Sequence, residues 1–504
     1  MGGGYSAPVE EKATVTISGG TFNCFVTGGG GFDSETTATC GSTELNITGG
    51  TINKWTYGGG WASPVLGTAT VKVSGTPSLA TLCGGGVMAT ASCQNTDVQV
   101  SSDIDGWLFA GGEIGPVNGT AKLTVTSGSI AHNIYGGGTS ASCNRTEVTL
   151  LGGEVSGNVF GGGEGGDVIE ESHLTISGTP TISGDVFGGG LQGQVFGSTN
   201  VVFDGGTVGG IFGGGWGDDY LDDGYSPDNG RVGSANVTIN GNTNKIVYGN
   251  GYCSSVTNDI NITVNSGNKI SVYGLYSDSN YALQAGGDVN IKLNGGEISM
   301  AGLVVNNRMV ENTIGGKACI TVSPGIDATN LSEISSGNPK TGVIKDATFI
   351  FKDCGSAETP FEMPYNLQGF TTVELDNSYV KSQINTSPKR NTAICLDINK
   401  SNTLVGGGWS QPVKIAPFSD KTITTLEDMT TMFVIKDAAE LPDGVFEVDP
   451  GNLSSYGFFR VGDTYRVMLG IPGNDFLSSV TVDPTISGGS LTVSWKETKL
   501  FSAD

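Results

Sequence analysis

The chain has 504 residues, of which 83 are Gly, and only 15% are charged. Asp and Glu outnumber Lys and Arg by 49 to 25, and the net charge of −24 argues against nucleic acid or anionic membranes as partners, because both need basic surfaces. No apolar run reaches the roughly 18 residues that cross a membrane, and the only two histidines, His132 and His173, leave little room for His-based catalysis.

A Gly triplet recurs along the first half of the chain. Its copies lie at residues 58–60, 84–86, 136–138, 161–163, 188–190 and 213–215, with Ala-Gly-Gly as the copy at 110–112. The steps are 25 to 27 residues, and a fixed period of this length is typical of a solenoid. We expect Gly at these corners because each corner needs φ > 0 and because stacked corners approach closely.

Each repeat has the same internal pattern. It opens with two apolar residues spaced by two, as in Val148 and Leu150, which predicts a strand with one buried face. A second short strand ends in an apolar residue followed by an aromatic, as in Val159 and Phe160. We expect a third inward column five residues before each opening apolar residue. That column comprises Cys40, Leu66, Cys93, Asn118, Cys143, Ile169, Phe196 and Val232.

These columns, with no helical pattern between them, predict an all-β fold. We expect a right-handed parallel β-helix of about 15 turns, with about 26 residues per turn and three strands in each. Later turns are expected at Ile320/Val322, Phe349/Phe351, Val373/Leu375 and Leu396/Ile398. The predicted organisation is a lead-in at 1–13, regular turns at 14–315, degenerate turns at 316–412, and a β cap or small β domain at 413–504.

The aromatic residues before the triplets form a further column. They are Tyr57, Phe109, Tyr135, Phe160, Phe187, Phe212, Tyr248 and Tyr273. We interpret them as core or corner packing, with an exposed aromatic ladder as the alternative. The nine cysteines are interpreted as buried, unpaired thiols, because those that share a column lie two turns apart, too far for a disulfide.

The loop after the triplet is longest at residues 31–39 and 216–231, and insertions on one corner of a solenoid often form its interaction face. The second insertion is rich in Asp and aromatic residues. Its carboxylates suit Ca²⁺, with a solvated acidic loop as the alternative. The candidate calcium ligands are Asp218, Asp219, Asp222, Asp223 and Asp228. The candidate ligand-binding residues are Trp61, Trp216, Tyr220, Tyr225 and Arg231.

Trp follows the triplet at Trp61, Trp216 and Trp409. Such a side chain either stacks on a sugar ring or folds back over the bare Gly corner. Trp61 and Trp216 are six turns apart, about 29 Å, so they do not belong to one small-ligand site. No catalytic residue is predicted, and calcium is the only cofactor considered.

Residues 47–52 read ITGGTI and residues 134–138 read IYGGG. These repeat sequences resemble the Gly-rich regions of large bacterial surface proteins of the adhesin type. The resemblance implies a right-handed parallel β-helix of the pectin-lyase-like class, which also contains polysaccharide lyases and glycoside hydrolases. It covers residues 10–315 well and 316–412 loosely.

These features favour a binding protein over an enzyme. We expect an extracellular or cell-surface adhesin or stalk module, monomeric, whose partner is a glycan, a glycoprotein or another surface protein. Its signal and anchor are expected outside this sequence. A polysaccharide-degrading enzyme and a phage tail-fibre or spike component are the alternatives. Lyases of this class use a Lys or Arg base, whereas Arg145, Arg231 and Arg308 are scattered over different turns.

Overall fold

The computed structural model describes residues 1–31, 38–217, 228–277, 282–306, 312–337, 342–343, 346–383, 392–396, 402–410, 413–417, 434–436, 445–448, 456–461, 464–469, 479–487 and 490–498. Over these residues the chain is an all-β parallel β-solenoid of about 13 turns, with about 27 residues per turn and no helix. The predicted fold class and period are confirmed, and the expected number of turns was slightly too high. The chain divides into two compact units, described separately below.

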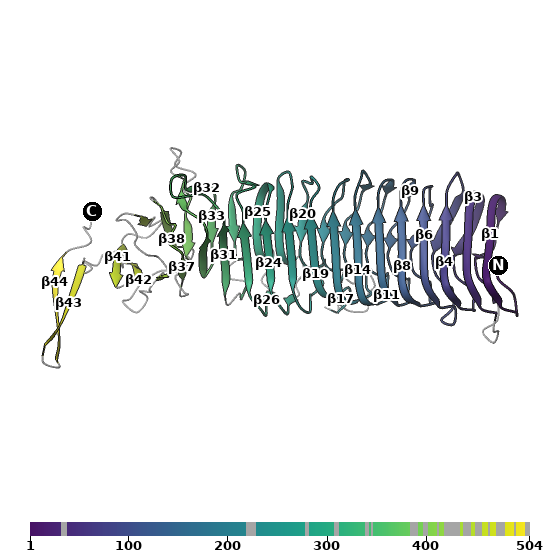
Figure 1. Ribbon diagram of the computed structural model, residues 1–504, viewed down its shortest axis with the longest axis horizontal. Coiled ribbons are helices and arrows are strands. Elements are labelled where there is room, and N and C mark those ends of the chain that lie inside the picture. The colour runs from purple at the N-terminus through teal and green to yellow at the C-terminus, as the bar shows by residue number, and fades with distance from the viewer. Residues whose placement is uncertain are drawn as a thin grey trace. The chain divides into compact units, whose positions relative to one another are not determined.

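The first unit comprises residues 1–318, 325–330 and 341–343, and its long strands stack along one side of the coil, here called the long wall (Figure 1). The long-wall strands are β1 (Val9–Phe22), β3 (Cys40–Tyr57), β4 (Val65–Val73), β6 (Cys93–Val100), β8 (Val117–Val125), β11 (Cys143–Leu150), β14 (Val168–Ile176), β17 (Val195–Phe203), β19 (Val232–Ile239), β21 (Ile260–Val264) and β24 (Val289–Leu293). All pair in parallel, and Val148 lies opposite Leu123 and Leu174. The opening apolar residues therefore stack in buried columns, as predicted.

Shorter strands, most of which precede a Gly triplet, form the short wall. These are β2 (Val26–Thr27), the end of β3, β5 (Ser78–Cys83), β7 (Leu108–Phe109), β10 (Ile134–Tyr135), β13 (Val159–Phe160), β16 (Val186–Phe187), β18 (Ile211–Phe212), β20 (Ile246–Tyr248), β22 (Ile270–Ser277) and β25 (Gly296–Asn306). Further parallel pairs involve β23 (Gln284–Ala285), β26 (Asn312–Ile314), β28 (Ile326–Asp327) and β30 (Gly342–Val343).

A third wall joins the long wall to the short wall and was not predicted. It contains β9 (Ser129–Ile130), β12 (Glu154–Val155) and β15 (Thr181–Ile182), which pair in parallel. Ile130, Val155 and Ile182 stack there with almost no exposed surface. Sequence reasoning missed this column because each turn supplies only one large apolar residue to it, which leaves no alternating pair to recognise.

The predicted third column was wrong at four of its eight positions. Leu66 and Phe196 are 64% and 55% exposed, and Asn118 and Ile169 also face solvent. The buried column instead runs through the preceding residues, Val65, Val117, Val168 and Val195, in register with the cysteines. These turns hold one extra residue, which the structure absorbs as a register shift beside Cys143, and a shift of one residue moves a side chain to the opposite face. The column also begins the long strand and is not a strand of its own.

The reason for the Gly triplets is close backbone approach. None of the triplet glycines between residues 58 and 215 has a positive φ, so that part of the expectation was wrong. A Cβ on Gly137 would lie 2.8 Å from the Cα and N atoms of Gly163 in the next turn. Positive φ occurs instead at the corner after the long strand, for example at Gly153 and Gly178.

A buried hydroxyl column ties the long wall to the triplet corner. Thr96 Oγ1 donates to the carbonyl of Ala110 at 2.6 Å, and Thr199 Oγ1 donates to that of Gly213 at 2.6 Å. Thr43 and Ser172 donate in the same way to Gly58 and Gly188. These side chains satisfy carbonyl groups of the corner inside the coil.

The second unit comprises residues 319–324, 331–340 and 344–504. Parallel pairing runs through β29 (Glu333–Ser335), β31 (Ala347–Lys352), β33 (Asn366–Gln368), β34 (Thr372–Asp376), β36 (Ile394–Leu396), β37 (Thr403–Val405), β38 (Val413–Pro417), β39 (Val434–Lys436) and β40 (Phe446–Val448). Phe349 pairs with Val373 as predicted. The next partner of Val373 is Leu404 and not Leu396, which lies opposite Pro417.

Other strands of this unit lie outside that stack. β32 (Phe361–Met363) pairs in parallel with β35 (Val380–Ser382). Two antiparallel hairpins follow, β41 (Tyr456–Val461) with β42 (Thr464–Leu469) and β43 (Ser479–Ser487) with β44 (Ser490–Thr498). Parallel stacking thus extends past residue 412, to β40, before the antiparallel hairpins begin. Among the described residues, no helix is long and apolar enough to span a membrane.

Candidate binding surfaces

Most of the predicted Asp-rich loop lies outside the described residues. This applies to Asp218, Asp219, Tyr220, Asp222, Asp223 and Tyr225. At the end of that loop, Arg231 Nη1 forms an ion pair with Asp228 Oδ1 at 2.7 Å, with both side chains partly exposed. A guanidinium on Asp228 supplies a positive charge where the calcium hypothesis would place a cation. Of the insertion at 31–39, residues 32–37 are also outside the described part.

The aromatic column is core, as the first interpretation held. Rings from Phe109 to Tyr248 stack turn upon turn, with successive centroids 4.7–5.1 Å apart. Neighbouring side chains of a strand point to opposite faces of the sheet, so Val159 and Phe160 lie on opposite faces of the short wall. Both are nevertheless fully buried. The rings therefore form a second hydrophobic core beside the main one.

Trp61 and Trp216 pack against this second core. Trp61 lies 5.2 Å from the ring of Phe25, and Trp216 lies 5.5 Å from Phe187 and 4.9 Å from Tyr252, between ring centroids. Both indoles are partly buried, which fits the covering role better than the sugar-stacking one. Trp409 is almost fully buried, with its ring 5.9 Å from that of Phe446.

Two carboxylates share the register position of these Trp residues. Glu113 and Glu164 each follow a triplet position. The backbone N–H of each donates to the carbonyl oxygen of a triplet glycine in the preceding turn, with an N–O distance of 3.0 Å. Tyr57 donates its hydroxyl to Glu113 Oε2 at 2.5 Å. Burial raises the pKa of Glu164 above its usual range, and burial with the Glu113 hydrogen bond raises that of Tyr57. Sequence reasoning missed both acids because a lone Glu after Gly carries no motif.

A polar hollow of about 410 Å³ lies on the outer face of β4, β6 and β8. Its lining includes Lys72, Asp97, Gln99 and Lys122, with serine and threonine hydroxyls along one side. Asp97 lies opposite Lys122 across the strands and accepts a hydrogen bond from Gln99 Nε2 at 2.8 Å. Lysine, carboxylate, amide and hydroxyl groups on one rigid sheet offer donors and acceptors to a polar ligand. In the sequence, the only sign of these lining residues is that they occupy the outward-facing positions of the alternating strands.

The acidic neighbour of this hollow is neutralised. Glu44 forms ion pairs with Lys12 and with Lys72, the latter at 3.1 Å. Hydrogen bonds from these two ammonium groups lower the pKa of Glu44 to about 2. At neutral pH the Lys72 end of the hollow therefore has one carboxylate shared by two ammonium groups. Lys122, across from Asp97, is the second cationic group of the lining.

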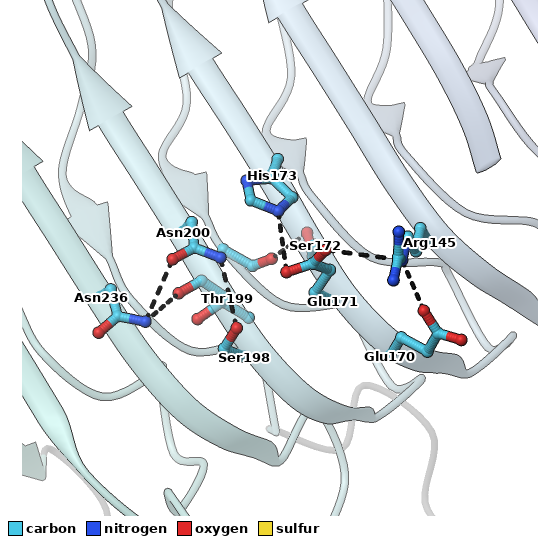
Figure 2. A network of polar contacts seen from close by, with 10 residues as sticks. Arg145, Glu170, Glu171, Ser172, His173, Ser198, Thr199, Asn200 and Asn236 are labelled. Carbon is cyan, nitrogen blue, oxygen red and sulfur yellow. Dashed lines mark hydrogen bonds and ion pairs between the residues drawn. The ribbon is translucent and has the colours of Figure 1, made fainter.

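Farther along the same wall, polar side chains bond to one another from strand to strand (Figure 2). Arg145 Nε pairs with Glu170 Oε2 at 2.5 Å and with Glu171 Oε1 at 3.5 Å, and His173 Nε2 lies 3.1 Å from Glu171 Oε2. Asn236 Nδ2 then donates to Asn200 Oδ1 at 3.2 Å. Asn261 and Asn290 continue this ladder of amides, which stabilises neighbouring strands in register.

Neither histidine joins a recognisable catalytic group. His132 stacks on Trp107 at 4.6 Å between ring centroids, and His173 contacts Glu171. Within the described part of the chain, no group of three or more His, Cys, Asp or Glu side chains is arranged to hold a metal ion.

None of the nine cysteines, all of which lie in described residues, forms a disulfide. Six are buried, whereas Cys24 is exposed and Cys319 and Cys395 are half-buried, so burial was predicted correctly for most of them. Burial raises the pKa of Cys93 and of Cys143 to about 12. Both remain thiols at neutral pH, and they fill space as small apolar residues.

Comparisons with protein-family models, curated proteins and solved structures gave no match. The class of protein is therefore defined by the fold alone, as a parallel β-solenoid repeat protein.

Proposed function

We propose that this chain is a rigid module of a cell-surface adhesin or stalk, which presents its walls and corner loops to a glycan or protein partner outside the cell. The observation that carries the proposal is the continuous parallel pairing of the long wall. Eleven strands from β1 to β24 stack in parallel, a span of about 48 Å at the usual strand spacing.

The rigidity of the stacked turns supports a role in presenting binding residues to a partner. The backbone of each turn bonds to the turns next to it, which makes a solenoid a stiff, extendable support, and the buried aromatic stack adds a second row of contacts along the coil. The exposed wall carries the polar hollow with Lys72 and Lys122. Functional residues on rigid elements are held more accurately than on loops. The pectin-lyase-like class, suggested by the wording of the repeat, is part of this proposal.

The test is a binding screen of the purified chain against immobilised glycoproteins and polysaccharides, with calcium and with a chelator. Two variants accompany it. Lys122→Ala alters the hollow, and a second variant shortens residues 216–231 to the common loop length. Thr263→Ala is the matched control, because it also faces outward from the long wall in β21 but lies far from the hollow.

The proposal expects specific binding by the intact chain that one of the two variants weakens and the control does not. Loss of binding with the chelator would support the calcium hypothesis. Binding to no ligand would leave a structural spacer and contradict the adhesin. New reducing ends in the polysaccharides would indicate an enzyme instead, and a trimeric mass in solution would favour a tail-fibre or spike component.

A further inference from the structure

The outer face of the short wall carries a strip of three aromatic side chains in its first turns. Val26 pairs with Thr56, which places Phe25 beside Trp55. Trp55 pairs with Thr81, and the next strand places Trp107 beside Thr81. Phe25 and Trp107 are 44% and 39% exposed, and Trp55 is half-buried. The strip therefore runs along the solenoid axis for about three turns, roughly 14 Å.

Later turns use the same position differently. There it is occupied by Asn133, Asn158 and Asp185, and a side-chain oxygen of each accepts the backbone N–H of the next turn at 2.5–2.8 Å. A polar residue at this position thus stabilises the stack. Phe25 and Trp107 make no such bond and leave large rings in water, which is unfavourable. Stability of the coil does not account for the part of each ring that stays exposed.

The rings are held in fixed orientations. Trp107 stacks on His132 with planes 22° apart, and Trp55 stacks on Phe109 with centroids 6.3 Å apart and planes 18° apart. Phe25 contacts the ring of Trp61 at 5.2 Å. Rings that are already ordered lose little entropy when a ligand binds to them.

The charges beside the strip favour a neutral ligand. Lys54 precedes Trp55 and Asp105 lies two residues before Trp107, and these two charges cancel. The chain as a whole carries −24, so a polyanion is repelled at longer range. Flat apolar rings with balanced charges beside them complement a ligand that has apolar C–H faces and uncharged hydroxyl edges.

We infer that Phe25, Trp55 and Trp107 form a binding strip for a neutral oligosaccharide, whose sugar rings stack on the aromatic rings and whose chain runs along the solenoid axis. The inference rests on the proposed function as a binding module and names one ligand class and one site for it. It differs from the corner-loop site expected from the sequence.

The experiment measures binding of the intact chain to cellohexaose, mannohexaose, xylohexaose and chitohexaose, with an oligogalacturonate as acidic comparator. Calorimetry and tryptophan fluorescence provide the readouts. The variants are Trp107→Ala, Trp107→Phe and Phe25→Ala. Leu66→Ala is the control, because Leu66 is an even more exposed apolar residue and lies in β4 on the long wall. Melting temperatures verify that each variant is folded.

We expect at least one neutral oligosaccharide to bind, with Trp107→Ala about tenfold weaker and Trp107→Phe intermediate, since loss of one stacked ring is worth on the order of 1.4 kcal/mol. Leu66→Ala and the intact chain should bind equally. Binding unchanged by Trp107→Ala, or preference for the acidic comparator, overturns the strip. If the chain binds an immobilised protein but no free saccharide, the strip fails and the adhesin proposal stands. If it binds neither, both fail.

Discussion

The turns from residue 57 to 248 and those from residue 346 to 383 pack their corners and aromatic rings in different ways. In the first set, almost every turn repeats the Gly triplet, and the rings from Phe109 to Phe212 that precede it stack nearly parallel. In the second set the triplet is gone, and Phe349 packs edge-on against Phe351, Phe370 and Tyr365. Identical turns allow identical contacts, whereas irregular turns need a separate packing solution each.

The corner after the long strand shows the same contrast. In many turns of the first unit, Gly takes the positive φ there, as at Gly153 and Gly178. In the second unit, Asp353 and Asn377 adopt φ of 57° and 49° instead, and Asn377 Nδ2 donates to Asp353 Oδ1 at 2.8 Å. Asn and Asp are the L-residues that tolerate this region best. The corner geometry is therefore kept while its residue changes.

The largest loss of stability is expected when one buried aromatic ring is removed from either region. Phe160→Ala and Phe370→Ala both remove a buried Phe and should each lower the free energy of unfolding by about 3–5 kcal/mol. Because Phe160 stacks on Tyr135 and Phe187, its loss should also raise amide hydrogen exchange in the turns on both sides. Damage confined to one turn would show that the stack is not a shared spine.

A backbone test comes next. Gly137→Ala places a Cβ 2.8 Å from Gly163 and should destabilise the first unit by roughly 1–3 kcal/mol through overpacking. Gly19→Ala is the control, since a Cβ there meets no atom within 4 Å. Its effect should stay below about 1 kcal/mol. Denaturant unfolding measures both, and equal effects would refute close approach as the reason for the triplet.

The buried hydroxyl column provides a third test. Thr199→Val keeps the shape but leaves the Gly213 carbonyl without the 2.6 Å hydrogen bond, and should cost about 1–2 kcal/mol. Thr238→Val, on the outer face of β19, is the comparison and should change stability by less than about 0.5 kcal/mol. An unchanged midpoint for Thr199→Val would mean that another group satisfies the carbonyl.

The smallest effect is expected at the corner of the second unit. Asn377→Ala should destabilise by about 1 kcal/mol, because Ala is strained at a φ of 49°. Asn377→Gly should lie within about 0.5 kcal/mol of the parent, as relief of strain offsets the greater freedom of the unfolded chain. Thermal unfolding distinguishes them. If Ala and Gly behave alike, the hydrogen bond to Asp353 and not the φ angle sets the preference for Asn.

Repetition made much of the fold predictable. The alternation at Val148 and Leu150 recurs so often that one register satisfies every turn, and the core role of Phe160 followed from the same period. The site was less accessible. Trp55 and Trp107 occur at one register position with an unlike residue between them, so no periodic signal connects them. The hollow with Lys122 depends on outward positions, where polar residues carry little pattern.

By itself, the sequence determined the parallel coil, its period and most buried columns. A solenoid repeats one set of local contacts, and these contacts require the same residue types at a fixed spacing along the chain. Only the tertiary structure decided which neighbour fills the column at Val168 or Ile169, because a single extra residue reverses the two faces. It also decided that Trp61 packs against the second core while Trp107 remains exposed, since exposure depends on what adjacent turns place beside each ring.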